Sequence, residues 1–177
     1  MSYNPDLHHR RSIRLQGYDY TNVGAYFVTI CTYQRLCLFG EIIKGQMQLN
    51  LIGQTATALW KDIPKHFSNV ELDEFILMPD HLHGIIIISQ QEPSPNFPDK
   101  KYAVTGTQPS SLGAIVQNFK SISTRKINRI NRSPRNFIWQ RNYHEQIIRD
   151  ESTLQNVRQY IGDNPLKWQS DRQINLP

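Results

Sequence analysis

The sequence has only two cysteines and no long hydrophobic run, and both scarcities exclude classes of protein. Cys31 and Cys37 fall in or near one expected strand, so we interpret them as reduced packing residues and not as a disulfide framework. The four isoleucines at 85–88 are far too few to span a membrane. The polar, basic first residues lack the apolar core of a secretion signal. We therefore expect a cytoplasmic protein with no membrane partner.

Length and charge limit the number of domains and the kind of partner. A chain of 177 residues, 38% of them hydrophobic, is long enough for one domain with a real core and short for two. We expect a single domain over 1–177, with a basic arm at 1–24 and a flexible, proline-rich insertion at 90–110. The formal charge of +5 favours a polyanionic partner, although a solvated basic surface would give the same count.

The hydrophobic pattern predicts alternating strands and helices. Strands are expected at 25–35, on either side of the Pro79-Asp80 turn, and in the aromatic stretch 136–143. A short ribbon should turn at Lys44-Gly45. Helices are expected from the Asn50 cap to about Pro64, from Ser111 to before Pro134, and over 150–165, where Gly162 and Pro165 should end the chain's last helix.

This order of elements predicts a fold. Strand, helix, strand, strand, helix, strand is the βαββαβ order of a ferredoxin-like domain, here followed by one more helix. We therefore expect an α+β protein with an antiparallel sheet, helices on one face, and an additional C-terminal helix.

Two histidines, His81 and His83, stand at the start of the strand that runs into the isoleucines. Side chains two apart in a strand point to the same face, so both imidazoles project together and could share a metal ion. Two hydrogen-bonded histidines at a strand edge would look the same, so a further ligand is needed. Tyr160 and Asn164 are four residues apart on the last expected helix and could bring a hydroxyl and an amide oxygen to one face. Ordinary packing of Tyr160 and helix capping by Asn164 are the structural alternatives.

These residues resemble a known family in four blocks that follow one another along most of the chain. The blocks are YFVTICT (26–32), FILMPDHLHGII (75–86), IWQRNYHEQIIRD (138–150) and VRQYIGDNPLKW (157–168). Together they resemble the single-tyrosine transposases of the HUH superfamily, and most of all the REP-associated tyrosine transposases of the IS200-like group.

The resemblance implies roles for particular residues. Tyr160 takes the place of the nucleophile, and His81, His83 and Asn164 take the places of the ligands of Mg²⁺ or Mn²⁺. Glutamine is usual in the insertion-sequence branch where Asn164 stands. The implied activity is cleavage and rejoining of single-stranded, hairpin-associated DNA through a 5′-phosphotyrosine intermediate, by a monomer or a homodimer. A free tyrosine, with a pKa near about 10, needs a cation or base to help remove its proton.

Basic residues suggest where DNA phosphates could bind, although a charged helix face is often only solvated. The candidates lie in the arm, along the second long helix and after it: Arg10, Arg11, Arg14, Lys120, Arg125, Lys126, Arg129, Arg132 and Arg141. A competing assignment makes Tyr143 the nucleophile, with His144 or Glu145 as ligand.

Other functions fit parts of the pattern. A non-catalytic module that binds single-stranded nucleic acid would share the fold and the basic charge. A His-x-His metalloenzyme of the cupin type is disfavoured by the expected helices, because cupins are double-sheet β proteins. A replication initiator or relaxase of the same superfamily would be expected to carry further segments that this chain lacks.

Overall fold

A four-stranded antiparallel sheet forms the centre of the protein, as a computed structural model describes it for residues 18–90, 107–133 and 135–174. Its strands are β1 (Gly24–Cys31), β4 (Val70–Leu77), β5 (His81–Ile88) and β6 (His144–Ile148). They lie in the order β4-β5-β1-β6, and each neighbouring pair is antiparallel. This is the strand order of a βαββαβ domain, so the predicted ferredoxin-like fold is confirmed.

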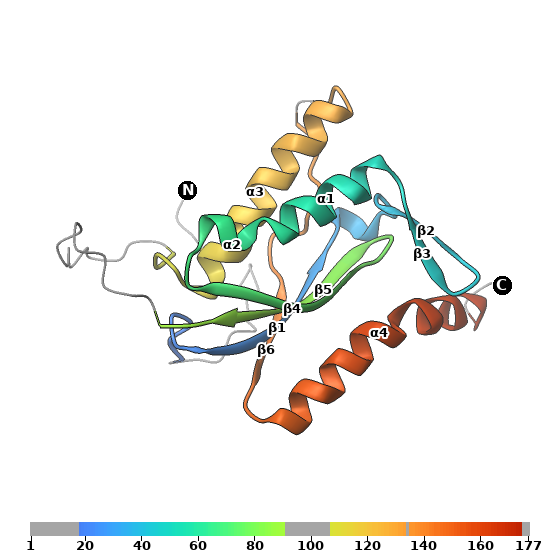
Figure 1. Cartoon of the computed structure of the whole chain (residues 1–177). Coiled ribbons are helices and arrows are strands. Elements are labelled where there is room, and N and C mark those ends of the chain that lie inside the picture. The colour runs from blue at the N-terminus through green and yellow to red at the C-terminus, as the bar shows by residue number, and fades with distance from the viewer. Residues whose placement is uncertain (1–17, 91–106, 134, 175–177) are drawn as a thin grey trace, which may run out of the picture.

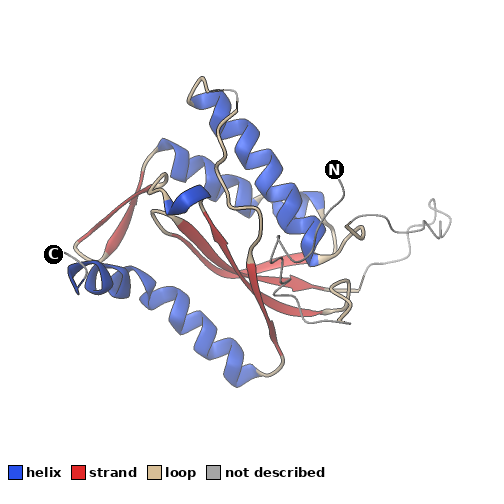
Figure 2. Cartoon of the chain, turned by 180° about the vertical axis from the view of Figure 1, so that it is seen from behind, coloured by secondary structure: helices blue, strands red, loops and turns tan. Residues whose placement is uncertain are grey.

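Helices cover both faces of the sheet (Figures 1 and 2). One face carries α1 (Leu51–Lys61), the short α2 (Ile63–His66) and α3 (Leu112–Ile130). The additional helix, α4 (Glu151–Ile174), crosses the opposite face. The separation matters for function, because side chains of β5 alternate between the two helical layers.

The predicted helix starts are confirmed by their capping bonds. The side chain of Asn50 accepts a hydrogen bond from the backbone N–H of Gly53 at 2.9 Å, and Ser111 accepts one from Ala114 at 3.2 Å. Each bond satisfies a backbone donor that has no partner inside the first helical turn.

The predicted ribbon is also present. Strands β2 (Gly40–Ile43) and β3 (Gln46–Leu49) pair antiparallel, and the turn between them places Lys44 at φ 51° and Gly45 at φ 74°. Two consecutive positive φ angles are what a tight two-residue hairpin turn needs. The ribbon lies against the C-terminal part of α4, where a side chain at position 45 would collide with Leu166.

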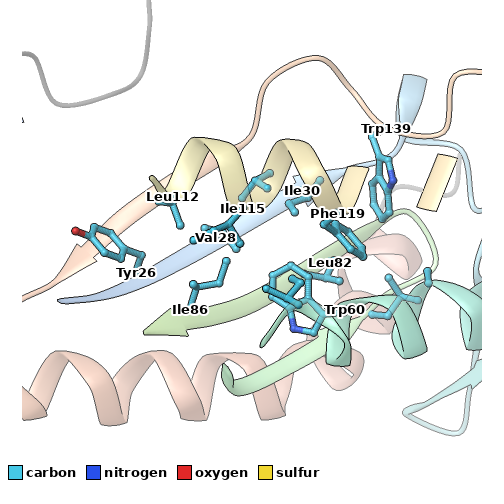
Figure 3. Close-up of a cluster of buried hydrophobic side chains, with 14 of the residues drawn as sticks. Tyr26, Val28, Ile30, Trp60, Leu82, Ile86, Leu112, Ile115, Phe119 and Trp139 are labelled. Carbon is cyan, nitrogen blue, oxygen red and sulfur yellow. The ribbon is translucent and has the colours of Figure 1, made fainter. Parts of the chain in front are cut away.

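The main core lies between the sheet and the α1/α3 layer (Figure 3). Trp60 of α1 is fully buried and meets Phe119 of α3 edge to face, with ring centroids 5.1 Å apart. The indole presses on β5 so closely that a Cβ at Gly84 would lie 2.5 Å from it. Glycine after His83 therefore has a packing reason, and the histidine strand is fixed from its far side.

A second, smaller core lies between the sheet and α4. It consists of Ile85, Ile148, Val157 and Ile161, with partly buried apolar neighbours. Its existence follows from the alternation of β5, in which Ile85 faces α4 while Leu82 and Ile86 face the main core.

The prediction of a strand at 136–143 was wrong. Ile138 and Trp139 are buried in the main core, and Trp139 makes only one isolated bridge, to Thr32. The strand that pairs with β1 begins at His144 instead. The first strand is also shorter than predicted, because Tyr33–Arg35 form the 3₁₀ helix η1.

The prediction that Gly162 and Pro165 end the last helix was also wrong. Helix α4 continues through both residues to Ile174. Asn164 is therefore an internal helical residue and not a C-terminal cap.

Other predictions fall partly outside the described residues. Of the predicted arm, residues 1–17 are not described, while Tyr18 and Tyr20 pack on the main core. Most of the predicted insertion, 91–106, is likewise not described. Among the helices that are described, none is long and apolar enough to cross a membrane.

Candidate active site

His81 and His83 lie side by side on the α4 face of β5. Their ring centroids are 4.5 Å apart, and each side chain is almost completely buried. The predicted common projection of the two imidazoles is therefore present. They stand opposite Cys31 and Thr29 of β1, at the end of the sheet where β5 begins.

Each imidazole uses its Nδ1 atom for a bond within the protein. Nδ1 of His81 lies 2.6 Å from a carboxylate oxygen of Asp80, and Nδ1 of His83 lies 2.8 Å from the hydroxyl of Thr29. The carboxylate can only accept, so Nδ1 of His81 donates to it. With Nδ1 engaged, Nε2 is the nitrogen of each ring that is left for other chemistry.

Burial keeps His83 neutral. Its pKa is lowered to about 3, first by desolvation and then by the charges of His81 and Arg35. A neutral imidazole carries a lone pair on one nitrogen, which is the form that binds a metal ion or accepts a proton.

Asp80 is held from its other side by Arg35. The guanidinium Nε lies 2.9 Å from the second carboxylate oxygen, while Asp80 itself is only 3% exposed. Arg35 reaches it because Gln34 and Arg35 both adopt left-handed backbone angles, with φ of 53° and 57°. Such angles are unfavourable for residues other than glycine, so the contact to Asp80 is held by a constrained turn.

Tyr160 of α4 lies next to His83, at the edge of the second core. Its hydroxyl lies 3.5 Å from Nε2 of His83, and the two rings have centroids 5.2 Å apart. Phe27 packs edge-on against the Tyr160 ring, and Nζ of Lys167 lies 5.4 Å from its centroid. Tyr160 is 40% exposed, so the residue lies beside a buried imidazole and is still reached by solvent.

An ion pair fixes the helix that carries Tyr160. Arg158 donates from Nε and Nη2 to the two carboxylate oxygens of Asp73, at 3.0 and 2.6 Å. Asp73 lies where the pairing of β4 with β5 shifts register, between Leu72 and Phe75. The bidentate geometry restricts rotation and sliding of α4 against β4.

Asn164 and Trp168 complete this end of α4. Asn164 is 7% exposed and follows Tyr160 by about one helical turn, so the two side chains share a helix face. The Trp168 ring lies 5.5 Å from that of His81, measured between centroids. The helix beyond Pro165 therefore covers the histidine pair.

The donor atoms at this site suit a divalent metal ion. Two imidazoles with Nδ1 engaged are typical of metal-binding histidines, and an amide oxygen is a suitable further ligand. Over the described ranges, no cluster of three or more His, Cys, Asp or Glu side chains has a metal-binding arrangement. A third protein ligand would accordingly have to be a residue of another type, such as Asn164.

The predicted phosphate-binding residues are scattered. Arg10, Arg11 and Arg14 lie outside the described residues. Exposed cations on α3 or after it lie beyond the sheet from Tyr160, because α3 and α4 cover opposite faces; these are Arg125, Lys126, Arg129 and Arg132. Arg141 is exposed near the end of β1.

Lys120 is used inside the protein. Its ammonium donates to the carbonyl oxygens of Gln140, Arg141 and Asn142, and burial lowers its pKa to about 8. The side chain thereby secures the segment before β6, and these bonds engage its ammonium group inside the protein.

The competing tyrosine, Tyr143, lies elsewhere. It is partly buried and packs against the main core, on the side of α1 and α3. His144 is at the start of the edge strand β6, paired with Thr29 of β1. Tyr160, by contrast, contacts His83 directly.

Sequence reasoning missed Asp80, Thr29 and Arg35. Asp80 immediately precedes His81, so its position in the sequence could have indicated a carboxylate partner for that imidazole. Thr29 and Arg35 became visible only through the pairing of β1 with β5 and the turn after it.

Comparisons with known proteins give a family match and a shared fold. The sequence model described as "Transposase IS200 like" matches residues 102–164. A Haemophilus influenzae protein is 45% identical over 177 residues, which cover 96% of each chain. A solved structure described as a REP-associated tyrosine transposase bound to a REP hairpin shares the fold, with a TM-score of 0.57 and 15% identity over 88% of this chain and 74% of that one. Over residues 102–164 this chain is similar to the IS200-like transposase family, and its fold is that of a REP-associated tyrosine transposase.

Proposed function

We propose that the protein cleaves and rejoins single-stranded DNA, with Tyr160 as its nucleophile. The observation that carries this proposal is the approach of the Tyr160 hydroxyl to Nε2 of His83, at 3.5 Å, between residues far apart in the chain. A tyrosine with only a packing role would not need its hydroxyl beside a buried, neutral imidazole.

The proposed step conserves the energy of the phosphodiester bond. The phenolic oxygen of Tyr160 loses its proton to solvent and attacks phosphorus. The bond from phosphorus to the 3′ oxygen breaks, and the departing 3′ oxygen takes up a proton from solvent. The product is a 5′-phosphotyrosine and a free 3′ hydroxyl, a polarity that follows from the family resemblance. A 3′ hydroxyl of another strand can reverse the reaction, so joining needs no ATP.

His83 places a neutral imidazole beside the Tyr160 hydroxyl. Burial lowers the pKa of His83 to about 3, so the ring is neutral at physiological pH, and its Nε2 atom lies 3.5 Å from the hydroxyl. Lys167, whose Nζ lies 5.4 Å from the ring centroid, brings a positive charge beside the tyrosine.

A divalent ion, Mg²⁺ or Mn²⁺, would be held by His81, His83 and Asn164. When bound, it would neutralise charge on the phosphate and lower the pKa of nearby oxygen acids. Asp80 and Thr29 would orient the two imidazoles through their Nδ1 atoms.

The proposed ligand is hairpin-associated single-stranded DNA, in line with the hairpin named for the structurally similar transposase. Near the tyrosine, Arg35 and Lys167 are the exposed cations placed to meet phosphate, with side chains 47% and 56% exposed. The α3 cations would meet DNA only where it passes around to the other face. The contact between Tyr160 and His83 within one chain supports a site that a single chain builds.

The test is formation of a covalent adduct. Wild-type protein, Tyr160→Phe and Tyr143→Phe are incubated with end-labelled hairpin DNA and Mn²⁺ or Mg²⁺, then separated by denaturing electrophoresis. We expect an adduct with the wild type and Tyr143→Phe and none with Tyr160→Phe, which keeps the ring and its packing. Binding without any adduct in the wild type would favour a non-catalytic single-strand-binding module.

A further inference from the structure

Two exposed aromatic side chains from distant segments contact each other at the end of β1. Phe137 is 71% exposed and Tyr33 is 39% exposed, and their ring centroids are 5.3 Å apart at an interplanar angle of 38°. Among the described residues with large exposed apolar side chains, only these two and Tyr160 are aromatic. Single exposed apolar residues are common, whereas two aromatics held together on the surface need an explanation.

The pair is fixed by backbone bonds beside the candidate active site. The N–H of Tyr33 donates to the carbonyl of Ile138, and the N–H of Gln140 donates to that of Cys31. The preceding residue, Thr32, donates its own N–H to the carbonyl of Asp80, directly before His81. The aromatic surface is therefore anchored within two residues of the strand end that carries the histidines.

The surroundings of the pair are cationic. Arg35 follows Tyr33 in η1 with a side chain 47% exposed, and Arg135 and Arg141 are exposed on either side of Phe137. The nearby carboxylate, Asp80, is buried and already paired with Arg35 and His81. Positive charge next to exposed aromatic rings is the combination that binds single-stranded nucleic acid, whose bases stack while its phosphates meet the cations.

We propose that Tyr33 and Phe137 form a stacking platform for one unpaired base of the DNA strand that passes the Tyr160 site. The exposed face of Phe137 carries the base, and the guanidinium of Arg35 contacts an adjoining phosphate. This inference takes its ligand, single-stranded DNA, from the proposed function. The platform positions the strand and takes no part in bond breaking.

Binding is measured by fluorescence anisotropy in a Tyr160→Phe background, so that no strand is cut. The probe is a hairpin with a labelled single-stranded extension, prepared also as a series with one abasic position moved along the extension. Phe137→Leu keeps apolar bulk but removes the aromatic face, and Phe137→Tyr restores it. Val23→Ala is the matched control, because Val23 is 58% exposed and lies before the opposite end of β1.

We expect Phe137→Leu to weaken binding at least about 5-fold and Phe137→Tyr to restore it, because stacking on an aromatic side chain contributes at least that much per base. An abasic site at one position of the extension should weaken DNA binding by the parent protein by a similar factor. The same abasic site should cause no further loss of binding in Phe137→Leu. Val23→Ala should bind like the parent, and thermal melting of all variants checks that they fold.

The results separate this inference from the proposed function. Unchanged binding by Phe137→Leu, or the same abasic profile in parent and variant, overturns the platform even if wild-type protein forms the Tyr160 adduct. If Phe137→Leu loses affinity and no longer responds to the abasic site at one position of the DNA, the platform is supported even when no adduct forms. In that case only the proposed chemistry fails.

Discussion

The bond between Thr29 and His83 offers a sharp test of how the site is organised. Thr29→Val removes the hydroxyl that lies 2.8 Å from Nδ1 of His83 while keeping the shape of a β-branched side chain. His83 is only 5% exposed, so its ring nitrogen would lose its partner in a place that water does not readily reach. Leaving a buried polar group without a partner costs about 1–3 kcal/mol.

The matched control is Thr29→Ser, which keeps the hydroxyl and loses one half-buried methyl group, worth at most about 0.8 kcal/mol. Urea unfolding followed by tryptophan fluorescence measures stability, and adduct yield at increasing Mn²⁺ measures the metal requirement. We expect Thr29→Val to be the less stable variant and to need about 10- to 100-fold more metal, because the residues that orient metal-binding histidines affect affinity to that extent. A metal requirement equal to that of the wild type would refute the proposed role of Thr29.

Three further predictions concern packing, pH and metal. Gly84→Ala should destabilise the protein by about 1–3 kcal/mol in urea unfolding, because its Cβ would lie 2.5 Å from the buried Trp60. Gly162→Ala, with open space around it, should be neutral or stabilising by up to about 1 kcal/mol. Equal effects of the two substitutions would contradict the packing account. The pKa of His83 is about 3 in the folded protein against 6.5 as the ordinary value, so the unfolded chain binds the extra proton between these limits. The contribution of neutral His83 to the free energy of unfolding should be fully present above about pH 6.5 and fall toward pH 3 by up to about 1.4 kcal/mol per pH unit. Denaturation curves measured across pH should lack this dependence in His83→Asn. Excess EDTA should abolish adduct formation while leaving hairpin binding in place, as gel shifts would show, since phosphate contacts carry most of the affinity; cutting that persists in EDTA would exclude the metal.

The sequence predicted most of the fold because its strongest signals are local. The Asn50 and Ser111 caps, the Lys44-Gly45 turn and the alternation around His81 each depend on a few neighbouring residues. The strand order then followed from the order of the elements along the chain. The same alternation predicted that His81 and His83 would project together.

The errors occur where tertiary contacts outweigh local preference. The aromatic stretch 136–143 has the composition of a strand, yet Trp139 is needed in the main core, where its indole N–H donates to Ser123 at 2.9 Å. The polar segment that begins at His144 pairs with β1 instead, because strand preference depends strongly on context. The local sequence pattern does not indicate that the strand begins at His144 and not at 136.

Helix α4 continues past Pro165 for a similar reason. A proline inside a helix removes one backbone hydrogen bond and normally ends the helix. Here the residues that follow have partners elsewhere: Leu166 packs closely on Gly45 of the ribbon, and Trp168 contacts the ring of His81. These contacts lie far away in the sequence, so they could not be inferred from the helix alone.

The central claim, that Tyr160 is the nucleophile, is tested most directly by locating the covalent bond. The protein–DNA adduct is treated with nuclease and trypsin, and mass spectrometry identifies the peptide that retains a phosphonucleotide. Cleavage after Arg158 and Lys167 releases residues 159–167, whose only tyrosine is Tyr160, and cleavage after Arg141 and Arg149 releases 142–149, whose only tyrosine is Tyr143. The account predicts the nucleotide on 159–167, and a nucleotide on 142–149 would contradict it.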